Sequence, residues 1–424
     1  MTEILVDDSR ARRAVVILTW AQSVLGMLLP VHMVLGGLAG GLLAPSLLFA
    51  TLPISLMVLG SMLGAPTLSA LMARIGRRAG FLIGALMGSA GGFIAAHAID
   101  TQSFALFLLG SFCIGLYTAG QNLYRFAATD MASDAYKPKA ISWVLAGGLV
   151  SALLGPEVIK RFGDLMEPVP YAGAYFVMGG IMLVGALPLF LLDIPHQSRG
   201  MPEAPGDAGR GAQREAQREA QREAQREAQR SLSEILREPS VAVAVLCGMA
   251  SYAMMTLMMT ATPLAMAACG FSTDPTADVV RAHVLAMYAP SLITGRIVAR
   301  FGAVPVVIAG QICLALAGGI AMSGITYTHF LSALILLGLG WNFGFIGATA
   351  MLSTATRPEE RNRVQGFNDF AVMALVLVAS LGSGAVLNSL GWMAVQAVML
   401  PLLTLAVGAL AWLHLDRRRE AAVR

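Results

Sequence analysis

We predict an all-α membrane protein with twelve transmembrane helices from three observations: the apolar composition, the recurrence of long apolar stretches, and the one-sided placement of Lys and Arg. Of the 424 residues, 56% are hydrophobic and only 13% are charged, whereas a soluble domain carries about 25% charged residues. A soluble protein could not hide so much apolar side chain from water, and a disordered chain would be far more polar. The composition therefore indicates a polytopic membrane protein and excludes an ordinary soluble enzyme.

Apolar stretches of about 20 residues recur along the whole chain, and each is long enough to cross a bilayer as a helix. They form two sets of six on either side of a polar segment. The predicted spans are 14–36, 46–72, 79–98, 104–126, 139–159, 171–192, 241–264, 278–299, 303–324, 329–354, 366–387 and 392–414. We therefore divide the chain into an N-terminal six-helix bundle at 1–193, a linker at 194–238 and a C-terminal six-helix bundle at 239–424.

The basic residues alternate between the two sides of the membrane very unevenly. If both termini lie in the cytoplasm, only Lys160, Arg161 and Arg281 of the 29 Lys and Arg residues fall on the outer side. Cytoplasmic loops of membrane proteins are enriched in Lys and Arg. The distribution therefore predicts that both termini lie in the cytoplasm.

The linker contains the tetrapeptide EAQR four times in succession, from Glu215 to Arg230. These residue types favour helix, and Glu and Arg three positions apart attract each other. The repeat has no apolar face that could pack on a core. We interpret it as a solvated spacer between the two bundles, with a partner-binding helix as the alternative.

Short segments of the two halves resemble each other. Residues 70–76 read ALMARIG and residues 296–302 read RIVARFG, at an offset of 226 positions. Internal repeats of this kind are typical of secondary transporters. The stretch from Ser69 to Arg78 resembles the loop between helices 2 and 3 of the major facilitator superfamily, with Ala73 in place of its acidic residue. This resemblance covers essentially the whole chain and implies two six-helix bundles, a central cavity and alternating access.

The seventh and eighth spans carry a set of soft donor atoms. Met255 and Met259 are four residues apart, as are His283 and Met287, so each pair shares one helix face. In an antiparallel hairpin Met255 is level with Met287, and Met259 with His283, roughly 7 to 14 Å below the outer surface. Thioether and imidazole donors without a carboxylate favour Cu(I) over Mg²⁺ or Ca²⁺. The alternative is ordinary core packing, because Met fills gaps in apolar interiors.

These two motifs resemble those of the CcoA-like transporters, which import copper for cytochrome oxidase assembly in bacteria. The resemblance implies a protein of the bacterial inner membrane in which Met255, Met259, His283 and Met287 bind copper. Cys247 and Cys269 also resemble cysteines of that family and are candidates for a copper relay. The same family contains riboflavin importers, so the resemblance does not fix the substrate.

Other polar and aromatic residues stand near the predicted span ends. Arg125, Asp130 and Asp369 are candidates for gating or for coupling to protons, and the alternative is that they only anchor loops. A second group could line a cavity for an aromatic solute or could serve as packing and interfacial anchors. This group consists of Trp143, Tyr252, Tyr288, Trp341 and Asn342.

We therefore expect a secondary transporter and not an enzyme, since the chain lacks the motifs of nucleotide hydrolysis, zinc proteolysis and lipase chemistry. The main prediction is copper import by alternating access, with copper as substrate and no permanently bound cofactor. The expected partners are membrane lipids and periplasmic or cytoplasmic copper chaperones, and no nucleic acid. The alternatives are a riboflavin importer on the same fold, a small-molecule exporter and a membrane sensor that uses the linker as its output.

Overall fold

The computed structural model describes residues 8–130, 132–133, 136–194, 230–357 and 360–423. This part of the chain is built from helices, and twelve helical stretches are long and apolar enough to cross a membrane. They match the predicted spans one for one, from Ser9–Leu43 to Trp392–Leu413. The prediction of an all-α protein with twelve membrane-spanning helices is confirmed.

Several spans consist of more than one helix, because short 3-10 or irregular segments interrupt them. The first half contains α1 (Ser9–Val24), η1 (Leu25–Met27), α2 (Leu28–Leu43), η2 (Leu47–Phe49), α3 (Leu52–Ile75), α4 (Arg77–Asp100), α5 (Phe104–Gln121), α6 (Tyr124–Ala127), α7 (Lys137–Phe162), α8 (Ala172–Gly185) and η3 (Leu187–Leu191). The second half contains α10 (Leu232–Leu236), α11 (Pro239–Ala268), α12 (Thr273–Tyr288), α13 (Ser291–Phe301), α14 (Ala303–Ser323), α15 (Tyr327–Ala355), α16 (Arg361–Leu390) and α17 (Trp392–Val423).

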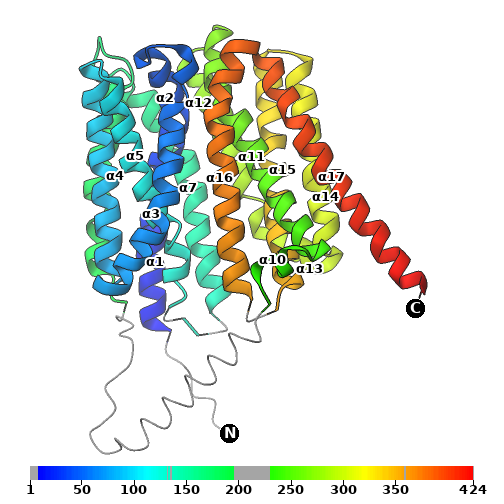
Figure 1. Ribbon diagram of the computed structural model, residues 1–424. Coiled ribbons are helices and arrows are strands. Elements are labelled where there is room, and N and C mark those ends of the chain that lie inside the picture. The colour runs from blue at the N-terminus through cyan, green and yellow to red at the C-terminus, as the bar shows by residue number, and fades with distance from the viewer. Residues whose placement is uncertain (1–7, 131, 134–135, 195–229, 358–359, 424) are drawn as a thin grey trace, which may run out of the picture.

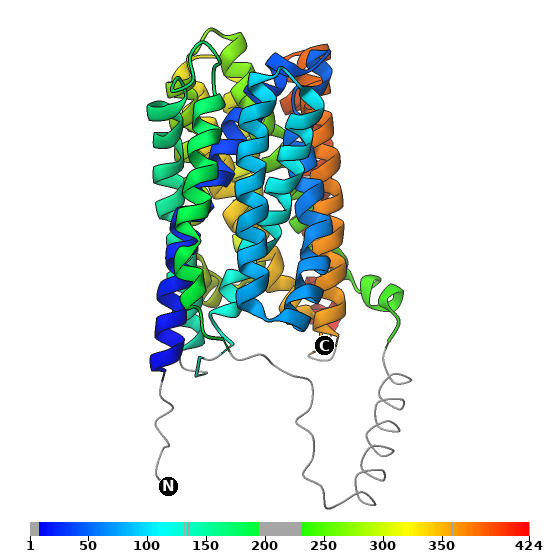
Figure 2. The same ribbon diagram turned by 90° about the vertical axis from the view of Figure 1, so that its left-hand side faces the viewer.

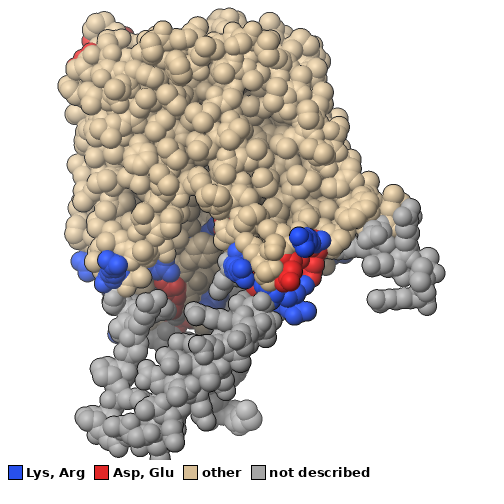
Figure 3. Space-filling view, viewed as in Figure 1, with Lys and Arg blue, Asp and Glu red and all other residues tan. Residues whose placement is uncertain are grey.

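The two halves stand side by side with their long helices running in the same general direction (Figure 1). The start of α1 and the end of α17 lie at one end of the bundle, which the perpendicular view also shows for α1 (Figure 2). We call this end the terminal face and the opposite end the far face. Lys and Arg side chains gather at the terminal face (Figure 3). This one-sided charge is the basis for the predicted cytoplasmic position of the terminal face.

The weak sequence repeat corresponds to a repeated backbone turn. Gly76 connects α3 to α4 with φ 89° and ψ 159°, and Gly302 connects α13 to α14 with φ 85° and ψ 162°. Such a positive φ is accessible to glycine at little cost and is strained for other residues. Each glycine ends one helix and begins the next, so both halves reverse the chain at the terminal face within a single residue.

Helices of the same half approach closely where glycine replaces a side chain. A Cβ atom on Gly115 would lie 2.2 Å from the Met57 carbonyl oxygen, and one on Gly310 would lie 2.3 Å from the Gly344 nitrogen. These positions join α3 to α5 and α14 to α15. Small residues are typical of helix contacts in membranes, where packing stabilises association without a hydrophobic driving force.

The end of the EAQR repeat is anchored to the second half. The Arg230 guanidinium donates hydrogen bonds of 2.9 Å to both carboxylate oxygens of Glu360 and also contacts Glu238. Directly after it, α10 begins with a capping box between Ser231 and Glu234. The rest of the repeat, 215–229, lies outside the described residues. The spacer interpretation therefore stays a prediction for that part, while Arg230 belongs to the fold.

We expect Glu360→Gln to lower the melting temperature of the detergent-solubilised protein near neutral pH but not in acid. The hydrogen bonds from Arg230 hold the pKa of the Glu360 carboxyl below its usual range. A carboxyl with a depressed folded-state pKa stabilises the fold above its unfolded pKa of about 4.3, and this contribution is lost as the pH falls through the folded-state pKa. Melting curves of both proteins across pH measure the difference.

The matched control for this experiment is Asp164→Asn, which neutralises an exposed carboxylate on the connection between α7 and α8. It should leave the melting temperature unchanged across the same pH range. A Glu360→Gln effect of equal size in acid and at neutral pH would contradict a contribution from the charge of the pair.

Candidate functional site

Hydrogen bonds join the two halves near the far face. The Thr51 hydroxyl donates to the Ser380 carbonyl oxygen at 3.2 Å and accepts from the Gly384 N–H at 3.1 Å. The hydroxyls of Ser55 and Ser380 lie 2.9 Å apart. These residues stand at the start of α3 and in the last third of α16, so the contacts close the far end of the seam between the halves.

Four charged residues at the same end form a second connection, which we call the far-face ion network. Lys160 of α7 pairs with Asp278 of α12 at 2.7 Å, and Arg281 of α12 pairs with Glu157 of α7 at 3.0 Å. Arg281 also contacts Asp278. The distribution of basic residues in the sequence places Lys160 and Arg281 on the same side of the membrane but does not indicate that they link the two halves.

The halves separate toward the terminal face. Figure 3 shows the surface hollowed there, between the two blocks that the far face holds together. The structure is thus closed by polar contacts at the far face and open at the terminal face. A solute in the centre of the molecule would reach the solvent on the terminal side only.

An aromatic cluster lies in the second half, facing the first. Its members come from three helices: Tyr252 from α11, Tyr288 from the end of α12, and Trp341 and Phe345 from α15. The Trp341 and Phe345 rings are stacked with centroids 5.5 Å apart, and Tyr252 meets both rings edge-on at 5.4 and 5.2 Å. Tyr288 contacts Trp341 at 6.2 Å. The buried indole N–H of Trp341 has no hydrogen-bond partner among the described residues.

Asn342 holds the backbone in place where the eighth span is interrupted. Its side-chain amide donates to the Met287 carbonyl oxygen and to the Ser291 hydroxyl, both at 2.6 Å. Its oxygen accepts from the Thr294 hydroxyl at 2.6 Å. Asn342 thus satisfies polar groups between α12 and α13, and its amide is not available to line a cavity in this conformation.

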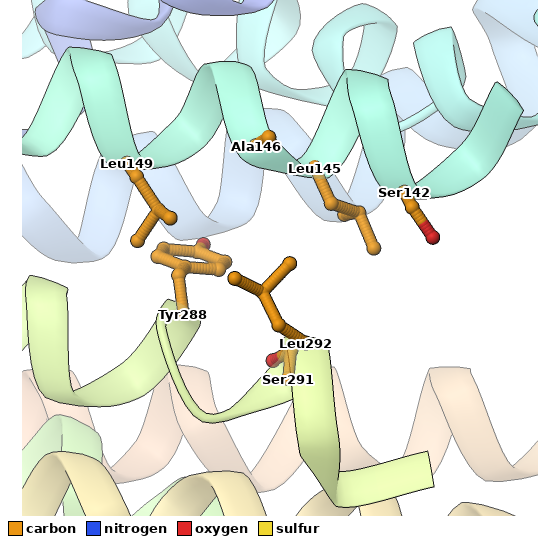
Figure 4. Close-up of a pocket in the computed structure, with 7 residues that line it drawn as sticks. All are labelled: Ser142, Leu145, Ala146, Leu149, Tyr288, Ser291 and Leu292. Carbon is orange, nitrogen blue, oxygen red and sulfur yellow. The ribbon is translucent and has the colours of Figure 1, made fainter. Parts of the chain in front are cut away.

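Tyr288 also borders a small cavity between the halves (Figure 4). The cavity has a volume of about 60 Å³ and lies between Ser142, Leu145 and Leu149 of α7 on one side and Tyr288 and Leu292 on the other. Ligand pockets usually measure about 300–1,000 Å³. A solute larger than a few waters would therefore not fit in this cavity.

Arg125 is a cationic residue of the first half that lies near the aromatic cluster. It belongs to α6, which follows the irregular residues that interrupt the fourth span. Its guanidinium lies over the Phe126 ring at 4.9 Å and within electrostatic reach of the Tyr252 and Tyr288 hydroxyls. The side chain is exposed, and no ion pair of Arg125 is found in the described part of the chain.

The four predicted copper ligands are all buried in the second half. The His283 Nδ1 lies 2.8 Å from the Leu334 carbonyl oxygen of α15, so Nδ1 carries the hydrogen and Nε2 the lone pair. Nε2 is buried without a hydrogen-bond partner among the described residues. The helix that carries His283 and Met287 packs mainly on α15 and α7 rather than on the helix of Met255 and Met259. Copper binding by these residues stays a prediction.

The remaining candidates lie in different surroundings. The Cys247 thiol is buried against the Ala406 carbonyl oxygen of α17, and Cys269 is exposed at the far end of α11. Asp130 pairs with Arg77 of its own half at 2.9 Å. Asp369 is exposed and accepts a hydrogen bond of 2.8 Å from Gln365.

Three of the four members of the aromatic cluster were predicted from the sequence, and one was not. Trp143, which was grouped with Tyr252, Tyr288 and Trp341, is 53% exposed and has no contact with their rings among those described. Phe345, which completes the cluster, was not selected. Its position one turn after Trp341 on the same helix was the available signal.

Comparisons with known proteins agree with this architecture. The sequence profile described as Major Facilitator Superfamily matches residues 14–289 and 244–424. The riboflavin transporter RfnT of Brucella anthropi is 40% identical over 403 residues, which cover 95% of this chain and 96% of that protein. YdeG, an uncharacterized transporter of the same superfamily from Bacillus subtilis, is 28% identical over 89% of this chain and 87% of its own length.

Among solved structures, the xylose transporter XylE from E. coli superposes with a TM-score of 0.63 over 94% of this chain and 96% of that chain, at 14% identity. This likeness concerns the fold, while the family match and the identity to RfnT concern the sequence. The protein is a membrane transporter of small molecules and not an enzyme. The chain belongs to the Major Facilitator Superfamily of secondary transporters, as the loop between its second and third spans had indicated.

Proposed function

We propose that the protein imports riboflavin across the bacterial plasma membrane. The observation that carries this proposal is the 40% identity to the riboflavin transporter RfnT along almost the entire length of both chains. Riboflavin import is therefore favoured over copper import, which the methionine and histidine motifs predicted. Copper import, a role in cytochrome oxidase assembly and copper chaperones as partners have no support among these relatives.

The site between the halves suits the chemistry of riboflavin. The vitamin has a flat three-ring isoalloxazine with carbonyl and ring-nitrogen acceptors on one edge and a flexible polyhydroxyl chain, and it carries no charge at neutral pH. Flat rings pack against aromatic side chains, which Tyr252, Tyr288, Trp341 and Phe345 provide. Arg125 offers several N–H donors in a fixed fork to the acceptor edge, and the unpartnered Trp341 N–H is a further donor.

The open terminal face provides the route by which a transported solute would be released. With the far face closed by Thr51, Ser380 and the ion network, a bound solute can leave only toward the terminal face. If that face is cytoplasmic, as the Lys and Arg distribution predicts, the structure corresponds to the stage at which imported riboflavin is released.

The deciding experiment expresses the protein in a bacterium that can neither make nor import riboflavin. We expect growth on low external riboflavin and saturable uptake of labelled riboflavin. Cellular copper is measured in the same strains. Growth without riboflavin uptake, or a rise in cell copper without riboflavin uptake, would overturn the proposal.

We expect the double substitution Met255→Leu and Met259→Leu to leave riboflavin uptake within about twofold of the wild type, because Leu keeps the apolar volume while removing both sulfur atoms. Copper uptake through these ligands would instead be abolished, since a carbon atom cannot bind the metal. Uptake of both substrates is measured on the same variant.

The hydrogen bonding of His283 keeps copper as the second candidate substrate. A neutral imidazole whose Nδ1–H is fixed by a backbone carbonyl, with its Nε2 lone pair unpartnered, has the form of a metal-binding histidine. His283 has this form. Loss of copper uptake in the double variant, with riboflavin uptake absent from the wild type, would select the copper function.

A further inference from the structure

A basic cavity opens at the terminal face of the first half, away from the aromatic cluster. It has a volume of about 300 Å³ and lies where the turn between α3 and α4 meets the segment that follows η3. The first wall contains three arginines, and the second contains one carboxylate. The lining residues are Arg74, Ile75, Gly76, Arg77, Arg78, Leu192, Asp193 and Ile194.

The charge of this cavity is only partly balanced. Arg77 pairs with Asp130 at 2.9 Å, whereas no ion pair of Arg74 or Arg78 is found among the described residues. The first turn of α4 contains no acidic side chain, and its N-terminal N–H groups receive no side-chain cap. The positive end of a 24-residue helix therefore adds to the arginines. A ligand with negative charge and several acceptor oxygens would be complementary to this wall.

The apolar rim shows which kind of anion fits. Ile75 ends the second span and is 45% exposed, and Leu187, Phe190 and Leu191 at the end of the sixth span are 52–59% exposed. The Arg78 guanidinium lies over the Phe190 ring at 6.0 Å. The basic wall thus sits at the level where two spans leave the apolar layer, with exposed apolar side chains beside it. A free phosphate would leave this rim uncovered, whereas acyl chains would cover it.

We propose that this cavity binds the headgroup of an anionic phospholipid of the surrounding membrane, with its acyl chains against η3 and the end of α3. Arg74 and Arg78 contact the phosphate, and Arg77 is held in position by Asp130. Basic pockets between transmembrane helices on the cytoplasmic side are suited to such headgroups. The proposal does not depend on which substrate the protein carries.

The second half offers a matched comparison within the same chain. Gly302 has the conformation of Gly76, and Arg300 occupies the position of Arg74. The two residues after Gly302 are Ala303 and Val304, where the first half has Arg77 and Arg78. The repeated turn thus carries the full basic wall in only one of its two copies, so the second copy serves as the control.

The test measures phosphatidylglycerol bound to the purified, delipidated full-length protein by native mass spectrometry and by the shift in melting temperature. We expect one tightly bound phosphatidylglycerol per chain and at least about tenfold weaker binding by the double variant Arg74→Gln, Arg78→Gln, which loses two charge-assisted contacts. Arg300→Gln should bind as the wild type does, and Arg74→Lys, Arg78→Lys should bind more tightly than the Gln variant.

Two further arms distinguish the ligand. Phosphatidylcholine and inorganic phosphate at the same concentration should neither stabilise the protein nor compete with phosphatidylglycerol. Equal binding by the wild type and the Gln double variant would overturn the proposal, as would equal stabilisation by either alternative ligand. If the double variant does not fold, Arg78→Gln alone is compared with Arg300→Gln, and unchanged lipid binding by Arg78→Gln would count against the site.

Discussion

Arg125→Gln should strongly weaken the proposed riboflavin uptake while leaving the protein folded. Arg125 is exposed and lies near enough to Tyr252 and Tyr288 of the second half to interact with them electrostatically. A hydrogen bond to a charged group contributes about 1.5–3 kcal/mol, so its loss should raise the KM for riboflavin about 10- to 150-fold. Uptake of labelled riboflavin over a range of concentrations measures the change.

The control for this substitution is Arg300→Gln. Arg300 is also exposed and also lies over the ring of the following residue, Phe301, at 5.3 Å, but it stands on α13 at the terminal face and not beside the aromatic cluster. It should leave the KM unchanged. Arg125→Lys should give an intermediate KM, because lysine keeps the charge but lacks the planar fork of donors. An unchanged KM in Arg125→Gln would remove Arg125 from the substrate site.

Arg281→Glu should hold the far face open and slow transport. The substitution replaces the partner of Glu157 by a third carboxylate next to Glu157 and Asp278, leaving Lys160 as the single cation of the far-face ion network. Like charges in contact cost enough to raise the ratio of molecules open to closed at the far face at least about tenfold. Uptake should fall because the step that closes this face is disfavoured.

A cysteine probe reports the opening directly. Ser380 is fully buried in the seam in this conformation, where it contacts Ser55. All variants carry Cys269→Ser, which removes the exposed thiol at the same face. In this background Ser380→Cys should react with a membrane-impermeant maleimide at least about tenfold faster when Arg281→Glu is also present. Arg161→Glu is the control, because Arg161 is 74% exposed and its one ion pair within the described residues is with Glu157 of its own helix at 3.8 Å. Equal labelling rates in all variants would show that the network does not keep the far face closed.

The spacing of the predicted copper ligands determines which side chains share a helix face. Met255 with Met259, and His283 with Met287, do share helix faces, as the four-residue step requires. Sequence spacing could not show which neighbours those faces meet. Close approach of Gly338 brings α12 against α15, where the His283 Nδ1–H reaches the Leu334 carbonyl. Helix faces follow from the local sequence, but helix neighbours depend on packing along the whole chain.

The neighbours of Arg125 and of the charged residues at the far face also could not be predicted from the sequence. The sequence marks each of these residues as unusual, because charges are costly in or near an apolar span. It cannot show that Arg125 lies within electrostatic reach of Tyr252 and Tyr288. Nor can it show that Glu157 and Arg281, 124 positions apart, are partners. These relations cross from one half of the molecule to the other and arise only when the halves dock.

The sequence by itself determined the fold class, the twelve spans, the one-sided basic charge and the superfamily. All four follow from local or additive properties: a bilayer demands about 20 apolar residues for each helix, and Lys and Arg in the connections can be counted. Tertiary structure decided which face is closed, which aromatic rings form one cluster, and which arginines remain without a carboxylate partner in the described chain. These depend on contacts between distant segments, whose geometry is set by close helix packing at positions such as Gly115 and Gly310 and by the docking of the two halves.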